Sequence, residues 1–187
     1  MADLKTYDLF NADALRTIIL EHGREHKFKK GECFCRMECT AKEIGLVRNG
    51  VFGFSRPDGA GRDQILSLAS TGEFVGAVIS LYPTRRSAFD VTALCTSTVV
   101  SMPIAGAFGL AEELQPGFRA EFTEAIAYGF MMRGISFRCD KPEERYVELV
   151  ARIPNICDVI SMSAIASYLG LSREAFARLR GRMKDCL

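Results

Sequence analysis

The chain has 187 residues, of which 48% are hydrophobic and 25% charged, and its formal net charge is +1. This composition excludes a chain that is disordered throughout, because disorder needs lower hydrophobicity and a larger net charge. The N-terminus shows no basic start followed by an apolar run, so no signal peptide is expected. No segment approaches the roughly 18 apolar residues of a membrane span. We therefore expect a cytoplasmic protein without a membrane partner.

A helix is predicted over residues 11–23, ahead of a region of different character. Asn11 is a suitable N-cap, and Gly23 is a suitable end. One stripe of this helix carries Leu15, Ile18, Ile19 and His22.

From Arg24 onward, short runs of β-type residues alternate with turn signals. Asn49 and Gly50 lie between two apolar runs, which is a strong hairpin signal. Residues 57–59, Pro-Asp-Gly, predict the next turn. Strands this short and this regularly spaced predict a barrel or a double-sheet jelly roll, which ends at Pro103.

A long helix is predicted from about residue 116 to residue 138, because apolar side chains recur there at helical spacing. The small residues Ala125 and Gly129 would let a partner helix approach closely. Such a helix either joins two copies of the chain or packs wholly on its own barrel. It is too long for one small barrel to cover, so we expect a homodimer joined through residues 118–132.

Residues 140–142, Asp-Lys-Pro, interrupt the helical pattern and predict a hinge. A further helix is expected over residues 143–153. The chain then predicts two short helices around Gly170, the first of them capped by Ser161.

The second of these short helices has two unlike faces. Ser172 is its N-cap, and Phe176, Leu179 and Met183 lie on the side that would pack inward. Arg173, Glu174 and Arg178 point outward near its N-terminal end, where a recognition helix meets base edges. Residues 160–187 carry more basic than acidic side chains, a feature of solvated helix faces as well as of nucleic-acid contacts. The basic residues are Arg173, Arg178, Arg180, Arg182 and Lys184.

With this pattern, Ser-Arg-Glu-x-x-x-Arg at residues 172–178, the sequence resembles the catabolite-activator and fumarate-nitrate-regulator (CRP/FNR) family of bacterial regulators. Residues 28–32, 44–50 and 72–76 look like the turns of that family's β-roll. The resemblance covers nearly the whole chain.

The resemblance implies an α+β fold in three parts. Residues 1–115 would form a cyclic-nucleotide-binding-like β-roll, of the double-stranded β-helix or jelly-roll type, that acts as a sensor. Residues 116–139 would form the dimerisation helix, and residues 140–187 a helix-turn-helix DNA-binding domain.

The resemblance also implies partners and roles. Arg173 and Arg178 would contact guanines, Glu174 a cytosine amino group and Ser172 a phosphate, as groove chemistry permits. The partners would be double-stranded DNA with an inverted-repeat operator, a second copy of the chain, RNA polymerase and a small-molecule effector. No cofactor is identified.

The family's effector site would fall on Gly76, Arg86, Ser87 and Ala88. An Arg beside a Ser suits an anionic phosphate. However, Ala77 stands where an acidic residue would hold the ribose, and Phe130 stands where a hydroxyl would face the base. Each lost hydrogen bond costs about 1–3 kcal/mol, so the effector is predicted not to be cyclic AMP. Arg86 would bind another anion or pair with a carboxylate.

Three functions other than that of a DNA-binding regulator are considered for this sequence. A barrel metalloenzyme needs several converging His ligands, and the chain has only His22 and His26, both ahead of the main strands. A redox or metal-responsive sensor of the same fold would use the cysteines, but Cys33, Cys35 and Cys39 lack a common ligand spacing. A structural role is favoured for them, and no metal site is predicted.

The third alternative is a β-roll binding module without DNA activity, in which the last helix is merely structural. No catalytic triad, phosphate loop or dinucleotide motif is present in the sequence, so we do not expect an enzyme.

Overall fold

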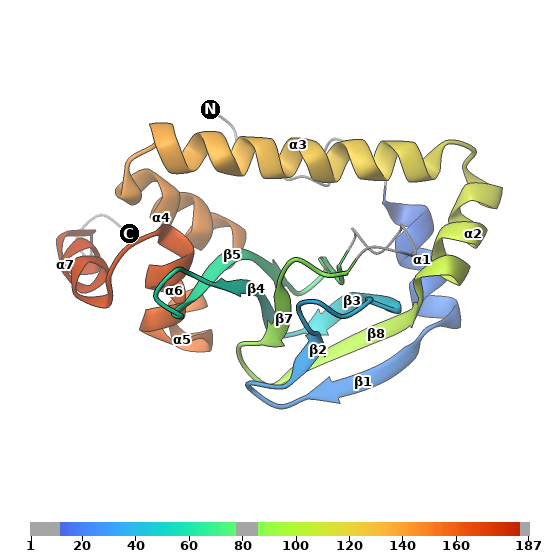
Figure 1. The fold of residues 1–187 in the computed structure, drawn as a ribbon, viewed down its shortest axis with the longest axis horizontal. Coiled ribbons are helices and arrows are strands. Elements are labelled where there is room, and N and C mark those ends of the chain that lie inside the picture. Colours follow the sequence, from blue (N-terminus) through green and yellow to red (C-terminus); the bar gives the residue numbers. More distant parts are fainter. Residues whose placement is uncertain (1–11, 78–85, 184–187) are drawn as a thin grey trace.

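A computed structural model describes residues 12–77 and 86–183. The chain starts with helix α1 (Asp13–His22), continues through a region of strands and ends in helices (Figure 1). The strands are β1 (Arg24–Phe28), β2 (Cys33–Cys35), β3 (Glu43–Asn49), β4 (Val51–Pro57), β5 (Asp63–Ser70), β6 (Phe74–Val75), β7 (Asp90–Ala93) and β8 (Ser97–Pro103). The later helices are α2 (Ile104–Leu114), α3 (Phe118–Cys139), α4 (Pro142–Arg152), α5 (Ile156–Val159), α6 (Met162–Leu169) and α7 (Arg173–Met183).

The strands form two antiparallel sheets that face each other, with the orders β1-β8-β3-β6 and β2-β7-β4-β5. Aromatic side chains fill the space between the sheets and under α2 and α3, among them Phe52, Phe74 and Phe108. This double-sheet β-roll, followed by helices, confirms the predicted fold class. Pro103 closes the last strand, as the sequence predicts.

The predicted hairpin at Asn49 and Gly50 is wrong in its pairing. A turn does form there, and Gly50 has a φ of 102°. However, β3 pairs with β6 and β8, whereas β4 pairs with β5 and β7. The turn therefore carries the chain from one sheet to the other. A Cβ at position 50 would collide with Ser97, so the crossing requires glycine.

The turn between β4 and β5 forms a true hairpin, as residues 57–59 predict. The Asp58 carboxylate accepts hydrogen bonds from the backbone N–H groups of Ala60 and Arg62, at 2.8 and 3.0 Å. These bonds, led by that from Arg62, and the Arg62 guanidinium lower the pKa of Asp58 to about 2. The ionised Asp58 carboxylate thus stabilises the hairpin turn through these hydrogen bonds.

A β-bulge in β5 decides which side chains face inward. Phe54 pairs with Ser67 but the next residue, Ser55, pairs with Ile65, so Leu66 is the extra residue. Ser67 shares the inner face of the sheet with Phe54. Because of the bulge, Ile65 lies with Leu68 on the outer face. One strand therefore borders the interior of the β-roll on one side and the C-terminal helices on the other.

Helix α1 buries Leu15, Ile18 and Ile19 as the sequence predicts, but His22 is exposed. The predicted cap, Asn11, lies outside the described residues. Helix α2 was not predicted, because Gly106 and Gly109 weaken its helical signal. It forms because its apolar side buries Ile104, Ala107, Phe108 and Ala111 against the β-roll.

Helix α3 runs along the molecule from the β-roll to the C-terminal helices (Figure 1). Its first half packs on its own β-roll and buries Phe118, Phe122 and Ala125. A partner helix therefore cannot meet Ala125, contrary to the expectation for that residue. Further along the helix, the Phe130 side chain is 55% exposed and Ile135 is 44% exposed. The first half of the helix thus packs on its own β-roll, and a dimer through the second half stays a prediction.

The C-terminal helices α4 to α7 share a second core with the outer face of β5. Ile165 and Leu169 of α6 lie in that core with Ile65 and Leu68. Across the described ranges, no helix has the length and apolar character that crossing a membrane requires.

Candidate functional site

Helices α6 and α7 form a helix-turn-helix whose ends are fixed by local hydrogen bonds. The Ser161 hydroxyl accepts the Ala164 N–H at 3.2 Å and caps α6. Gly170, with a φ of 70°, makes the turn. The Ser172 hydroxyl then accepts the Ala175 N–H at 3.1 Å and caps α7. The cap and turn residues therefore act as the sequence predicts.

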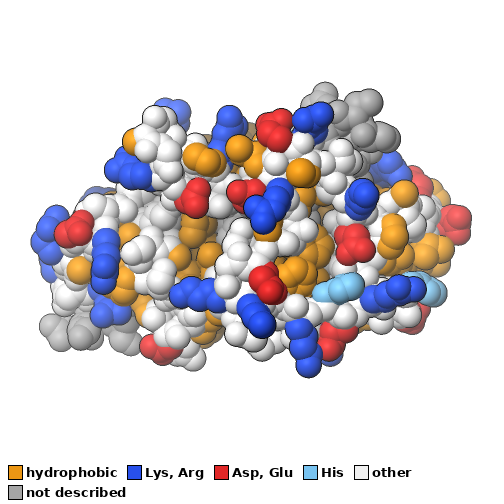
Figure 2. Space-filling model, turned by 60° about the horizontal axis from the view of Figure 1, so that its bottom comes forward, with side chains coloured by type: hydrophobic (Ala, Val, Ile, Leu, Met, Phe, Trp, Pro, Cys, Tyr) orange, Lys and Arg blue, Asp and Glu red, His pale blue; other side chains and the backbone are white. Residues whose placement is uncertain are grey.

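Helix α7 has a buried face and a charged face. Phe176 and Leu179 are buried, and the Phe176 ring packs edge-on against Tyr146 at a centroid distance of 5.3 Å. Arg173, Glu174 and Arg178 are all exposed on the other side. Figure 2 shows Lys and Arg side chains gathered at the end of the molecule that carries α7.

The Glu174 carboxylate is prepared to act as an acceptor. Its own backbone N–H, the Ser172 hydroxyl and the charges of Arg173 and Arg178 lower the pKa of Glu174. Glu174 is therefore ionised at neutral pH. The ionised carboxylate accepts hydrogen bonds and the guanidinium groups of Arg173 and Arg178 donate them, so this face of α7 offers both acceptors and donors to base edges.

Two other basic residues of α7 are engaged within the domain. An Nη2 of Arg182 lies 2.7 Å from the Glu143 carboxylate, and Arg180 contacts the sulfur of Met162 at 3.3 Å. Lys184 lies outside the described residues. Two of the basic residues predicted for this tail thus contact other helices of the protein.

The carbonyl end of α6 is held by two arginines that the sequence does not single out. Arg133 of α3 donates from Nη2 to the Tyr168 carbonyl oxygen at 2.6 Å, and Arg145 of α4 donates from Nη2 to that of Leu169 at 3.0 Å. Cations are favourable at a helix C-terminus, where the last carbonyls lack partners. These two contacts fix the turn that orients α7.

The helix-turn-helix is also bonded to the β-roll. The Ser167 hydroxyl of α6 accepts the backbone N–H of Ile65 at 2.8 Å. Arg133 donates from Nε to the carbonyl oxygen of Leu66, the bulged residue, at 3.4 Å. Both bonds fall on β5, so this strand is the junction between the two parts of the molecule.

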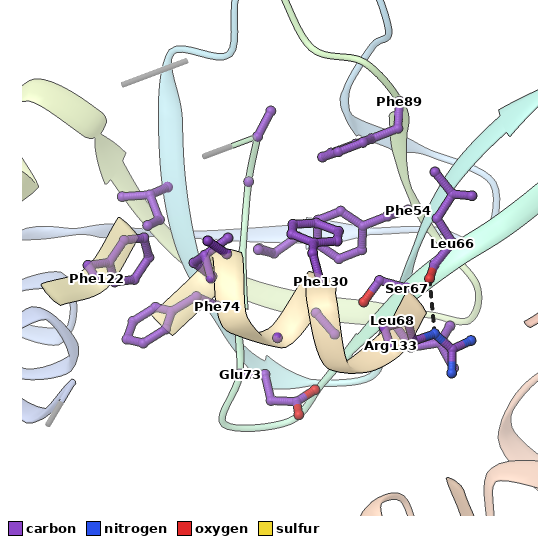
Figure 3. A pocket seen from close by; sticks show the side chains of 18 of the residues that line it. Phe54, Leu66, Ser67, Leu68, Glu73, Phe74, Phe89, Phe122, Phe130 and Arg133 are labelled. Atoms are coloured by element: carbon purple, nitrogen blue, oxygen red, sulfur yellow. Dashed lines mark hydrogen bonds between the residues drawn. The ribbon is translucent and has the colours of Figure 1, made fainter. Parts of the chain in front are cut away.

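A pocket of about 390 Å³ lies between the β-roll and α3 (Figure 3). Its walls come from the inner face of the sheets, from α2 and α3, and from Tyr168 of α6. Most of the lining is apolar: Ile44, Phe54, Leu66, Leu68, Ala69, Phe74, Val75, Ala77, Phe89, Ile104, Phe108, Phe122, Ile126, Ala127 and Phe130. The remaining lining residues are Ser67, Glu73, Gly76, Thr123, Gly129, Arg133, Arg152 and Tyr168.

The four residues predicted for the effector are not gathered in this pocket. In the described part of the chain, Gly76 lines it, and Arg86, Ser87 and Ala88 do not. Arg86 is exposed. Ser87 is fully buried, and its hydroxyl donates to the Phe89 carbonyl oxygen at 2.6 Å. Binding of an anion by Arg86 stays a prediction.

The cysteines of β2 behave as packing residues. Cys33 donates from its sulfur to the Cys35 carbonyl oxygen at 2.9 Å, and Cys35 is buried in the β-roll core. Burial raises the pKa of the Cys35 thiol, which disfavours the thiolate that metals bind. Over residues 12–77 and 86–183, no cluster of three or more His, Cys, Asp or Glu side chains is arranged to hold a metal ion.

Comparison with known proteins identifies the fold. Residues 25–113 match the cyclic nucleotide-binding domain family. FixK2 from Bradyrhizobium japonicum superposes with a TM-score of 0.72 at 16% identity, over 88% of this chain and 85% of that one. The c-di-GMP responsive global regulator CLP of Xanthomonas campestris gives 0.62 at 14% identity, over 94% and 93%.

The Thermus thermophilus catabolite activator protein has a TM-score of 0.57 at 14% identity, over 97% of this chain and 87% of that one. Among curated proteins, no sequence matches the chain. Residues 25–113 therefore resemble a cyclic nucleotide-binding domain, and the chain has the fold of CRP/FNR-family regulators, which confirms the fold that the sequence resemblance implies.

Proposed function

We propose that the protein is a homodimeric, sequence-specific DNA-binding transcription regulator. Its CRP/FNR fold and the match of residues 25–113 to the cyclic nucleotide-binding domain family support this proposal. The observation that carries the proposal is the exposed face of α7. Arg173, Glu174 and Arg178 lie together there, opposite a buried stripe, on a helix whose N-terminal end is capped by Ser172. Arg suits guanine and Glu suits the cytosine amino group in the major groove.

A dimer would present two copies of α7 to the same face of DNA. The exposed apolar side chains of the second half of α3, such as Met131 and Ile135, support a dimer surface there. Two recognition helices related by a two-fold axis read half-sites about 34 Å apart. The preferred operator is therefore an inverted repeat.

The β-roll would sense an effector other than cyclic AMP. Ala77 lines the pocket with no acceptor for a ribose hydroxyl, and Phe130 faces it from α3 with a ring in place of a hydroxyl (Figure 3). RNA polymerase is a further partner under this proposal.

The proposal is tested by selecting bound sites from random DNA with the purified protein. An inverted repeat should emerge. Arg178→Ala should weaken binding to the preferred site by about 1–3 kcal/mol and relax the choice at one base pair in each half-site. Arg48→Ala, which removes an exposed arginine of β3, should change neither. If Arg178→Ala leaves both affinity and preferred sequence as they are, α7 does not read bases.

A further inference from the structure

We propose that the pocket between the β-roll and α3 binds an uncharged, largely aromatic or aliphatic small molecule, and that β5 transmits its presence to the helix-turn-helix. The part of the proposal that concerns DNA rests on the proposed function, whereas the binding part does not. The pocket volume, about 390 Å³, falls within the range of about 300–1,000 Å³ that is typical of small-molecule sites.

The rings of the pocket wall favour an apolar occupant. Phe54 and Phe89 pack edge-on at a centroid distance of 5.4 Å on the sheet side, and Phe130 faces them from α3 (Figure 3). Water needs two to four polar partners to be stable in a cavity. A wall of this kind offers few, so an apolar molecule replaces poorly held water and gains the free energy of burial.

The polar groups of the wall are mostly engaged within the protein. The Glu73 carboxylate accepts hydrogen bonds from the Ser70 backbone N–H at 2.6 Å and the Ser70 hydroxyl at 3.0 Å. The Thr123 hydroxyl donates to the Arg119 carbonyl oxygen at 2.8 Å. The Ser67 hydroxyl, like that of Tyr168, makes no hydrogen bond to any residue that the structure describes. It therefore supplies one neutral polar contact for a ligand.

The two arginines at the α6 end of the pocket do not form an anion site. The Arg133 guanidinium lies over the Tyr168 ring at 3.7 Å and over the Phe137 ring at 4.7 Å, while its edge donates to backbone carbonyls. Arg152 lies 4.0 Å from the Glu73 carboxylate. Rings and carbonyls thus compensate the Arg133 cation, and the Glu73 carboxylate lies beside Arg152, although the buried Nη2 of Arg152 makes no hydrogen bond to a residue that the structure describes. A charged ligand would have to give up its hydration for cations that already contact other groups of the protein.

Strand β5 connects this pocket to the DNA-binding helices. Ser67 faces the pocket, and two residues earlier the Ile65 N–H is bonded to Ser167 of α6. Tyr168, the next residue of α6, itself lines the pocket. A ligand that displaces β5 or Tyr168 therefore acts directly on the helix that precedes the turn into α7. Ser167 is a positioning residue in this scheme and does not touch the ligand.

Binding is tested first without DNA, by fluorescence titration with two matched probes. Phenylnaphthylamine is neutral, and anilinonaphthalene sulfonate is the same ring system with one negative charge. We expect the neutral probe to bind at least about tenfold more tightly. Tighter binding of the sulfonate would overturn the proposal, because it would show that an arginine recruits an anion.

Pocket-filling variants locate the probe. Ala127→Trp on α3 and Ser67→Leu on β5 fill the pocket from opposite walls, and each should weaken the neutral probe at least about tenfold. Ala120→Trp makes the same change at an exposed position of α3 that does not line the pocket, and should have no effect. Equal losses in Ala120→Trp and Ala127→Trp, or none in either pocket variant, would place the probe elsewhere and refute the proposal.

The link to DNA is tested on a site selected without probe. Saturating neutral probe should change the DNA affinity of the wild-type chain at least about threefold. Ser167→Ala should bind the probe normally but lose most of that change, and Ser167→Thr should restore it. An unaltered response in Ser167→Ala would refute the route through β5. Probe binding without any DNA binding would instead refute the proposed function alone.

Discussion

Arg145 has an unusual place for a charged residue, since only 7% of it is exposed. Its Nη1 donates to the Asp140 carbonyl oxygen at 2.7 Å and its Nη2 to that of Leu169 at 3.0 Å. The guanidinium thus joins the break between α3 and α4 to the turn of the helix-turn-helix. A residue pattern alone would place an arginine at the surface. The pattern that buries this one is its position beside Tyr146 and four residues before Leu149 on α4.

Replacing Arg145 with Met should destabilise the C-terminal helices. Methionine keeps much of the side-chain volume but leaves the buried Leu169 carbonyl and the partly buried Asp140 carbonyl without their charged donor, at a cost of about 1.5–3 kcal/mol in the free energy of unfolding. Chemical denaturation measures this difference. Arg138→Met, which changes an exposed arginine near the end of α3, is the control and should be close to neutral. Equal free energies of unfolding for the two variants would mean that Arg145 does not stabilise the C-terminal helices.

Helices with a long apolar periodicity or a clear N-cap residue can be predicted from the sequence. Elements that depend on contacts between residues far apart in the chain cannot. Apolar spacing predicts α3 to within a few residues, and Ser172 predicts the start of α7. Helix α2 is not predicted, because its glycines have a low helix propensity. It is stabilised instead by tertiary packing, in which Phe108 is buried. The turn at Gly50 has hairpin chemistry, but the partner of each flanking strand is decided by the packing of two sheets.

The contact between α3 and the turn at Gly170 can be tested as a unit. A Cβ at position 170 would lie 2.5 Å from the Phe137 ring, and the residue has a φ of 70°. Gly170→Ala should therefore cost about 1–2 kcal/mol for the left-handed backbone, and more because Phe137 must move. In a double-mutant cycle, Phe137→Ala should relieve the steric part, so that the two losses sum to more than that of the double variant. Strict additivity would show that the ring does not confine this turn.

At the scale of the whole molecule, the two candidate sites differ in how many of their residues can be predicted from the sequence. The residues of α7 that we propose to read DNA lie within one turn and a half of helix, so a contiguous motif contains them all. The pocket draws its wall from β5, β6, α2, α3 and α6, which only the fold brings together. Gly76 was predicted for an effector and lines this pocket, but Ser67 and Arg133 carry no motif that would identify them. Their roles arise from a bulge and from a helix end.

The proposed dimer concerns the whole molecule, and it can be tested on the second half of α3. Met131 and Ile135 are 54% and 44% exposed and stand one turn apart, so they form part of one apolar stripe. Replacing both with Glu places two charges where a partner helix would bury them, which should weaken association by about a hundredfold or more. Sedimentation at micromolar concentration should show a dimer for the wild-type chain and a monomer for this variant. The monomer should also lose its affinity for the inverted repeat, because one recognition helix alone meets one half-site.

A matched control, Ala105→Glu with Leu114→Glu, adds the same charges at exposed positions of α2 and should remain dimeric. A monomeric wild-type chain, or a variant that still sediments as a dimer, would remove α3 as the dimer surface.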